Sequence, residues 1–173
     1  HFLCKARNTL YGRSMAKAKK TSRKSTSRNP SVVDALKQVL ADSYALMGQT
    51  HLCHWNVEGP GFFALHAAFE EQYTELFNAV DDIAERIRAL GAYSPGGLSN
   101  LAKLSGMKEL KENEKANTMV KHLASLHSKL IKDAATARDL AGNSNDKETE
   151  DMMIARIEVH QKTVWMLESY LKG

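Results

Sequence analysis

The sequence contains few of the residues that interrupt long helices or cross-link small domains. It has only three prolines in 173 residues, and its two cysteines, Cys4 and Cys53, cannot form a disulfide framework. No apolar run approaches the roughly 20 residues that a membrane-spanning helix requires, so we expect a soluble protein. The scarcity of proline favours long helices over a strand-rich fold, and the lack of disulfides favours a reducing, cytoplasmic environment.

Acidic residues are absent from positions 1–30, which carry nine Lys or Arg, whereas residues 31–173 carry 15 Lys or Arg against 20 Asp or Glu. We therefore expect a basic N-terminal tail (1–30) that is disordered when free, followed by an acidic domain (31–173). Met15 opens a segment that reads as a natural start, so residues 1–14 are interpreted as upstream or non-native sequence; a mitochondrial-type presequence is the alternative.

The tail is suited to binding a polyanion without reading its sequence. From residue 15 onward it has no aromatic side chain on which a base could stack, so its cations can contact phosphates only. We expect non-specific DNA binding, and hence a nucleoid-associated protein; a merely solubilising extension is the alternative. The expected DNA contacts are Lys17, Lys19, Lys20, Arg23, Lys24 and Arg28.

Hydrophobic spacing of three and four residues predicts four long helices, over about 31–56, 62–90, 116–140 and 147–171. Ser31 and Asp34 have the spacing of a capping box, and Gly91 ends the second helix. The segment 92–112 contains only enough apolar residues for about two helical turns. The pattern predicts an all-α, ferritin-like four-helix bundle with a short extra helix in the crossover between the second and third helices.

The second predicted helix carries a mixed seam beside its apolar stripe: Phe63, His66, Glu70, Phe77, Asp81 and Glu85. His66 and Glu70 share one helix face, as do Asp81 and Glu85. The two pairs lie about 22 Å apart along an unbroken helix, so no metal can be held by both pairs of one chain. Antiparallel packing against a second copy, about a two-fold axis near residue 75, would bring the pairs together and form two equivalent sites. Nitrogen and carboxylate ligands with open positions suit iron, which predicts an iron site made by dimerisation.

No Glu-x-x-His motif occurs in the chain, although ordinary ferritins build an iron site within one bundle from that motif. Instead, residues 51–91 contain HW-N-x-x-G-x-x-F-x-x-x-H, from His54 to His66, followed by the D-x-x-x-E element of Asp81 and Glu85. Together these elements resemble the Dps family, the miniature ferritins that protect starved bacterial cells. The resemblance extends over the bundle, about 140 residues, and includes Trp165.

The resemblance implies a dodecameric shell that oxidises ferrous iron, preferentially with hydrogen peroxide, stores ferric iron inside and often binds DNA. It implies metal binding by His54 and His66 of one subunit with Asp81 and Glu85 of the other. At position 70 the family usually has Asp, and the longer Glu70 affects the position of a second metal. Trp55 resembles the family tryptophan that intercepts oxidising equivalents near the metals. Our alternative is a chiefly structural DNA-compacting protein with a weak or vestigial metal site.

The acids at the start of the last helix have two interpretations. Asp146, Glu148 and Asp151 complement the helix dipole locally, and this is sufficient for a single chain. In the family, acids at this place line the three-fold pore through which ferrous iron enters, so the resemblance implies that role here.

The remaining candidate residues are assigned structural roles. His51 precedes His54 by one turn and is interpreted as an interface or core residue. His122, His127 and His160 have no carboxylate at a consistent spacing and are not expected to bind metal. Cys53 is predicted to be a buried small hydrophobic residue.

Overall fold

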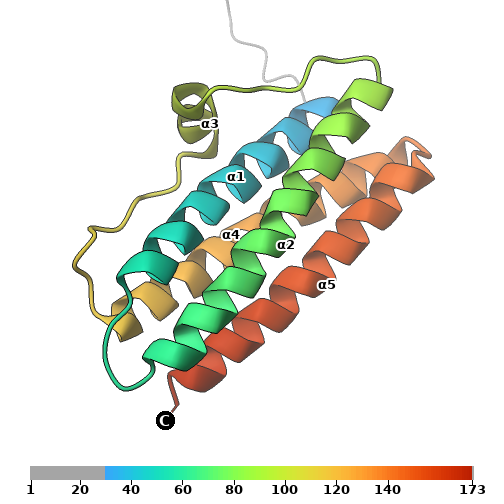
Figure 1. Cartoon of the computed structure of the whole chain (residues 1–173). Helices are drawn as coiled ribbons and strands as arrows, with labels where there is room; N and C mark the ends of the chain where they lie inside the picture. Colours follow the sequence, from blue (N-terminus) through green and yellow to red (C-terminus); the bar gives the residue numbers. More distant parts are fainter. Residues whose placement is uncertain (1–29, 173) are drawn as a thin grey trace, which may run out of the picture.

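The computed structural model describes residues 30–172, and the predicted DNA-binding tail lies outside this range. The described chain forms five helices: α1 (Val32–Asn56), α2 (Phe62–Ala89), α3 (Leu98–Ser105), α4 (Ala116–Asn143) and α5 (Lys147–Tyr170). Four long helices pack side by side, and α3 lies outside them against α1 (Figure 1). The predicted all-α bundle with a short crossover helix is confirmed. None of these helices is long and apolar enough to cross a membrane.

The start of α1 is fixed by the predicted capping box. The Ser31 hydroxyl accepts a hydrogen bond from the backbone N–H of Asp34, and the Asp34 carboxylate accepts one from the Ser31 N–H. These two bonds satisfy donors that have no partner within the helix.

The end of α4 differs from the prediction. We expected the helix to end at about residue 140, before the stretch 142–145, but α4 continues to Asn143 and the chain turns at Asn145, whose φ is 59°. The Ser144 N–H and hydroxyl both donate to the Leu140 carbonyl, so the last turn is satisfied without a glycine cap. Gly142 instead lies close to α5, where an added Cβ would be 2.7 Å from a Glu150 carboxylate oxygen and would displace that side chain.

The core is made by the apolar stripes of the four long helices. Phe69, Leu76 and Ile83 of α2 are fully buried in one cluster with Leu36 of α1 and Leu123 of α4. This predicted stripe turns the neighbouring mixed seam of α2 away from the core.

A long crossover joins α2 to α4 and runs along the outside of α1 (Figure 1). A buried carboxylate anchors α3 within it: Asp42 of α1 accepts hydrogen bonds from the Ser105 hydroxyl of α3 at 2.7 Å and from Lys129 of α4 at 2.8 Å. Lys129 also donates to Asp133. Helices α1, α3 and α4 therefore meet at one charged group, which holds α3 and the crossover against α1.

Candidate metal centre

The short connection between α1 and α2 brings His54 and His66 together. Gly59 has a φ of 102°, a conformation that side chains other than glycine rarely adopt, and it lets the chain reverse within five residues. The two imidazole rings then stack with their centroids 3.8 Å apart and their planes 19° apart.

Each histidine ring is oriented by the backbone of the other. His54 Nδ1 lies 2.8 Å from the His66 carbonyl oxygen, and His66 Nδ1 lies 2.9 Å from the His54 carbonyl oxygen. A carbonyl oxygen only accepts, so each Nδ1 carries the hydrogen and donates it. In the neutral ring, Nε2 then retains its lone pair. Fixing one ring nitrogen by a backbone carbonyl is the usual way in which proteins prepare the other nitrogen for a metal.

Further aromatic side chains lie beside the histidine pair and extend away from it. Phe62 of α2 stacks on His66, with ring centroids 5.0 Å apart. Among these aromatic residues, we predicted a role in the metal centre only for Trp55. Tyr73 of α2 lies edge-on to His54, with ring centroids 5.2 Å apart. His51 lies 4.1 Å from the Tyr73 ring on one side and stacks on Trp55 at 5.2 Å on the other. Tyr73 was missed because its spacing places it in the apolar stripe of α2.

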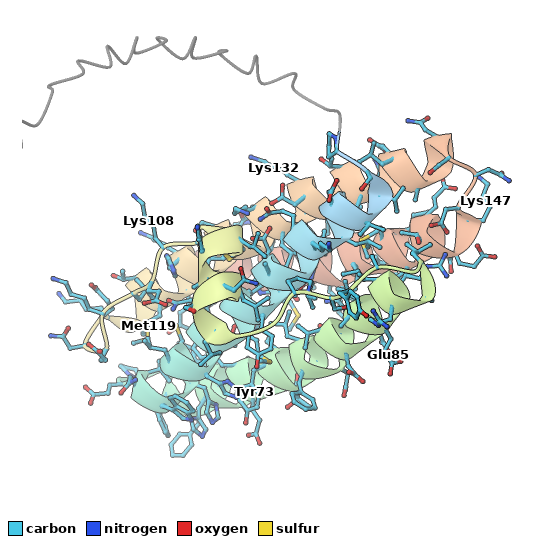
Figure 2. The ribbon with its side chains drawn as sticks, turned by 90° about the horizontal axis from the view of Figure 1, so that it is seen from above. Tyr73, Glu85, Lys108, Met119, Lys132 and Lys147 are labelled. Carbon is cyan, nitrogen blue, oxygen red and sulfur yellow. The ribbon has the colours of Figure 1, made fainter. Side chains whose placement is uncertain are left out.

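The predicted carboxylates lie elsewhere on α2. Asp81 and Glu85 are exposed, and Figure 2 shows Glu85 well along the helix from Tyr73. Glu70 is also exposed, one turn after His66. Within residues 30–172 of one chain, no three His, Cys, Asp or Glu side chains gather into a group that could hold a metal ion. One chain therefore supplies a histidine pair and a carboxylate pair at separate places.

The seam that joins the two pairs also exposes large apolar side chains. Phe63 is 86% exposed and Phe77 is 65% exposed in the single chain. Exposed apolar side chains beside candidate ligands are typical of a surface that another protein covers.

The acids at the start of α5 have different environments. Asp146 is the N-cap: it accepts from the Thr149 N–H at 3.1 Å and forms an ion pair with Arg86 of α2 at 2.6 Å. The hydrogen bonds from Thr149 and the Arg86 charge outweigh desolvation and lower the pKa of Asp146. Glu148 and Asp151 are exposed. The helix-capping interpretation thus applies to Asp146, and the pore role stays a prediction that depends mainly on the other two acids.

A second histidine cluster lies in the bundle core. His127 Nδ1 of α4 and His160 Nδ1 of α5 are 2.8 Å apart, and Arg156 Nη2 lies 3.0 Å from His160 Nε2. Arg156 also forms an ion pair with Glu75 of α2. We predicted structural roles for these histidines, and no third candidate metal ligand joins them in the described chain. The sequence did not reveal the cluster because its members come from three helices.

Burial keeps both core histidines neutral. Desolvation, followed by the nearby Arg156 charge, lowers the pKa of His127 to about 3. Desolvation, and then the His127 and Arg156 charges, lower the pKa of His160 well below its usual value. Cys53, beside the candidate metal centre, is fully buried, and burial raises its pKa to about 12, which confirms the predicted small hydrophobic role.

The chain is similar in sequence and in structure to known ferritin-like proteins. The family model for the ferritin-like domain matches residues 33–173. The chain is 35% identical to a DNA protection during starvation protein from Brevibacillus brevis, over 85% of this chain and 99% of that one. It superposes on the crystal structure of Dps from Staphylococcus aureus with a TM-score of 0.78 and 38% identity, covering 81% of this chain and 94% of that one.

A third similar protein carries a more specific description. The Dps protein of Vibrio cholerae O1 is described as a member of a broad superfamily of ferritin-like diiron-carboxylate proteins. It is 34% identical, with a TM-score of 0.78, over 81% of this chain and 88% of that one. The fold, the family model and these relatives together show that the chain belongs to the Dps family of ferritin-like proteins.

Proposed function

We propose that this protein oxidises ferrous iron at sites formed between two copies of the chain, with hydrogen peroxide as the oxidant. The observation that carries the proposal is the reciprocal bonding of His54 and His66, which leaves two Nε2 lone pairs for a metal. Each site would combine this histidine pair with Asp81 and Glu85 of a second copy, and two equivalent sites would form in each dimer.

Ferrous iron is the substrate of this reaction. The two imidazoles and the carboxylates suit ferrous iron, and the carboxylates also stabilise the ferric product through their negative charge. Two ferrous ions supply the two electrons that one peroxide requires: 2 Fe²⁺ + H₂O₂ + 2 H⁺ → 2 Fe³⁺ + 2 H₂O. Glu70, exposed beside His66, is our candidate ligand for the second iron. The superfamily description of the Vibrio cholerae relative supports a two-iron site.

The assembly would bury the exposed seam of α2. Phe77 supplies apolar surface between the two ligand pairs, and Phe63 supplies more just before His66, so the contact that completes the metal site would also stabilise the dimer. We propose that dimers assemble further into a dodecameric shell that stores ferric iron. Glu148 and Asp151, with Asp146 behind them, would line the pores through which ferrous iron enters.

We also propose that the shell protects DNA by binding it non-specifically through the tail, as a cytoplasmic, nucleoid-associated protein. The support is the contrast between nine Lys or Arg without an acid in residues 1–30 and the net negative remainder. Twelve tails on one shell would add weak phosphate contacts into strong binding. The name of the Brevibacillus brevis relative, a DNA protection during starvation protein, agrees with this role.

Neighbouring aspartates on α2 allow a closely matched test. Asp81 and Asp82 are both exposed and carry the same charge, but only Asp81 lies on the mixed seam. Oxidation of ferrous iron by peroxide should be followed by stopped-flow absorbance in the wild type, D81N and D82N. We expect D81N to lose most of the rate and D82N to retain it, with both assemblies unchanged in size.

The same measurement distinguishes the proposed iron oxidation from the alternative, a chiefly structural DNA-compacting role. A wild-type protein that condenses DNA but oxidises iron no faster than buffer would contradict the proposed activity and support a structural DNA-compacting role. Equal rates in D81N and D82N would remove Asp81 from the site.

A further inference from the structure

A continuous series of ring contacts leads from the candidate metal centre to Trp55. Tyr73 lies edge-on to His54 and also contacts His51, whose other neighbour is the Trp55 indole. The His51 and Trp55 planes differ by only 13°, so these two rings are stacked. Trp55 is 69% exposed in the single chain, whereas Tyr73 is half-buried. Tyrosine and tryptophan are thus joined through one imidazole.

The chemistry of peroxide gives this arrangement a use. Peroxide must accept two electrons to become water, but a site that holds a single ferrous ion supplies only one. The remaining oxidising equivalent would leave as a hydroxyl radical unless a nearby side chain supplied the second electron. Tyr73, edge-on to the proposed ligand His54, is placed to supply it.

We propose that Tyr73 is a relay residue that donates this second electron, and that it exchanges the resulting radical with Trp55 through the His51 ring. The first step is Fe²⁺ + H₂O₂ + Tyr73–OH + H⁺ → Fe³⁺ + Tyr73–O• + 2 H₂O, in which iron and tyrosine are each oxidised by one electron. The second is the reversible transfer Tyr73–O• + Trp55–H ⇌ Tyr73–OH + Trp55•, in which one electron and one proton move from tryptophan to tyrosine. The first step rests on the proposed function, whereas the second needs no iron.

His51 holds the two redox-active rings in contact and is not itself oxidised. Its ring lies between those of Tyr73 and Trp55, and burial, followed by the effect of His54, lowers its pKa and favours the neutral form. A flat ring at this position should therefore suffice: H51F should preserve the transfer, and H51A should interrupt it.

The exchange can be tested in iron-free protein. The background is W165F, which leaves Trp55 as the one tryptophan in the chain. A laser flash that ionises Trp55 should be followed by growth of a tyrosyl radical as Tyr73 is oxidised. This tyrosyl signal should disappear in W165F/Y73F and persist in W165F/Y44F. Tyr44 is the matched control because it lines the same surface groove as Trp55 but has no ring contact with it.

A tyrosyl signal of equal size in W165F/Y73F would overturn the assignment of Tyr73. Equal transfer rates in the H51A and H51F forms of the W165F protein would overturn the bridging role of His51. Because no iron is present, these results are independent of whether the protein oxidises iron.

The first step is tested separately, by freeze-quench electron paramagnetic resonance with peroxide and less than one ferrous ion per site. The wild type should give a radical that ring-deuterated tyrosine alters, and Y73F should instead release more hydroxyl radical to a spin trap. A wild type that oxidises iron but releases as much hydroxyl radical as Y73F would contradict the relay. A wild type that oxidises no iron under any loading would contradict the proposed function and this first step. The exchange between Tyr73 and Trp55 would then be decided by the laser-flash experiment alone.

Discussion

The core pair His127 and His160 shows how single residues set the response of the bundle to acid. Arg156 can only donate, so His160 Nε2 accepts its hydrogen bond and His160 Nδ1 carries the hydrogen that it donates to His127 Nδ1. His127 then carries its hydrogen on Nε2, a buried atom with no partner in the described chain. A proton added to either ring would break this arrangement of hydrogen bonds and place a positive charge beside Arg156.

We predict that this pair makes the protein less stable in acid. Both pKa values are lowered in the folded state, so below pH 6.5 the unfolded chain binds more protons and the free energy of unfolding falls with pH. At about pH 5 the loss should be about 2 kcal/mol for His127, because its folded pKa of about 3 lies well below that pH. The lowered pKa of His160 adds a loss in the same direction.

Urea unfolding of the wild type and H127Q at pH 7 and pH 5 measures this effect. Asp42 changes the free energy of unfolding in the opposite direction. Burial raises its pKa to about 6, so its contribution to stability grows as pH falls from there toward 3.8. The comparison with H127Q cancels this contribution, since Asp42 is present in both proteins. A pH dependence as steep in H127Q as in the wild type would contradict the account.

Residue-level prediction from sequence succeeded where contacts follow helical spacing. The i, i+4 pairs and the apolar stripe of α2 follow from that period alone. The reciprocal bonds between His54 and His66 depend on how tightly the chain reverses between α1 and α2, and His54 was assigned through the family resemblance. The ring contacts of Tyr73 and the pairing of the core histidines were missed because the partners lie on other helices, 33 residues apart for His127 and His160.

At the scale of elements, the crossover depends on one buried carboxylate. Asp42 accepts from Ser105 and from Lys129, and Gln38 donates to it as well. The sequence predicted the length of α3 from its apolar residues, but not this anchor, because Ser105 lies 63 residues from Asp42.

We predict that S105A loosens α3 and lowers the free energy of unfolding by about 1 kcal/mol, since Asp42 loses one of its donors in a buried site. Hydrogen exchange of residues 98–105 should become faster. S125A is the matched control, because that hydroxyl is exposed and bonds only the His122 carbonyl of its own helix. Unchanged exchange in S105A would show that α3 is held by apolar packing alone.

Different acids at the start of α5 are expected to affect stability and iron entry. Asp146 caps the helix and pairs with Arg86, so D146A should lower the free energy of unfolding by about 1–2 kcal/mol. Glu148 is 78% exposed at its side chain, and Asp151 is exposed, so E148Q/D151N should leave stability nearly unchanged.

If these two acids line a pore, E148Q/D151N should slow iron uptake at low iron, with the deficit shrinking when iron is abundant. Uptake and urea unfolding measured on the intact assembly distinguish the two effects. An E148Q/D151N shell that takes up dilute ferrous iron as fast as the wild type would leave the acids of α5 with their helix-end role only.

At the scale of the whole molecule, the charge division between residues 1–30 and the rest predicts two independent activities. Deletion through Arg28 should abolish DNA condensation and leave iron oxidation unchanged. Binding of duplex DNA by the full chain should weaken steeply as salt rises, with little preference among sequences. Gel-shift titrations at two salt concentrations check this, and salt-insensitive binding by the truncated protein would move the DNA contact to the bundle.

The central claim is that the metal site exists only between two copies, because the histidine pair and the carboxylate pair lie apart on one chain. The most direct measurement is peroxide-dependent iron oxidation by H66A and D81A, each alone and after mixing under conditions of subunit exchange. A mixed dimer has one site with both ligand pairs intact, so random mixing should restore about a quarter of the wild-type sites from two nearly inactive proteins. A mixture no more active than the average of its two components, although exchange has occurred, would contradict a shared site.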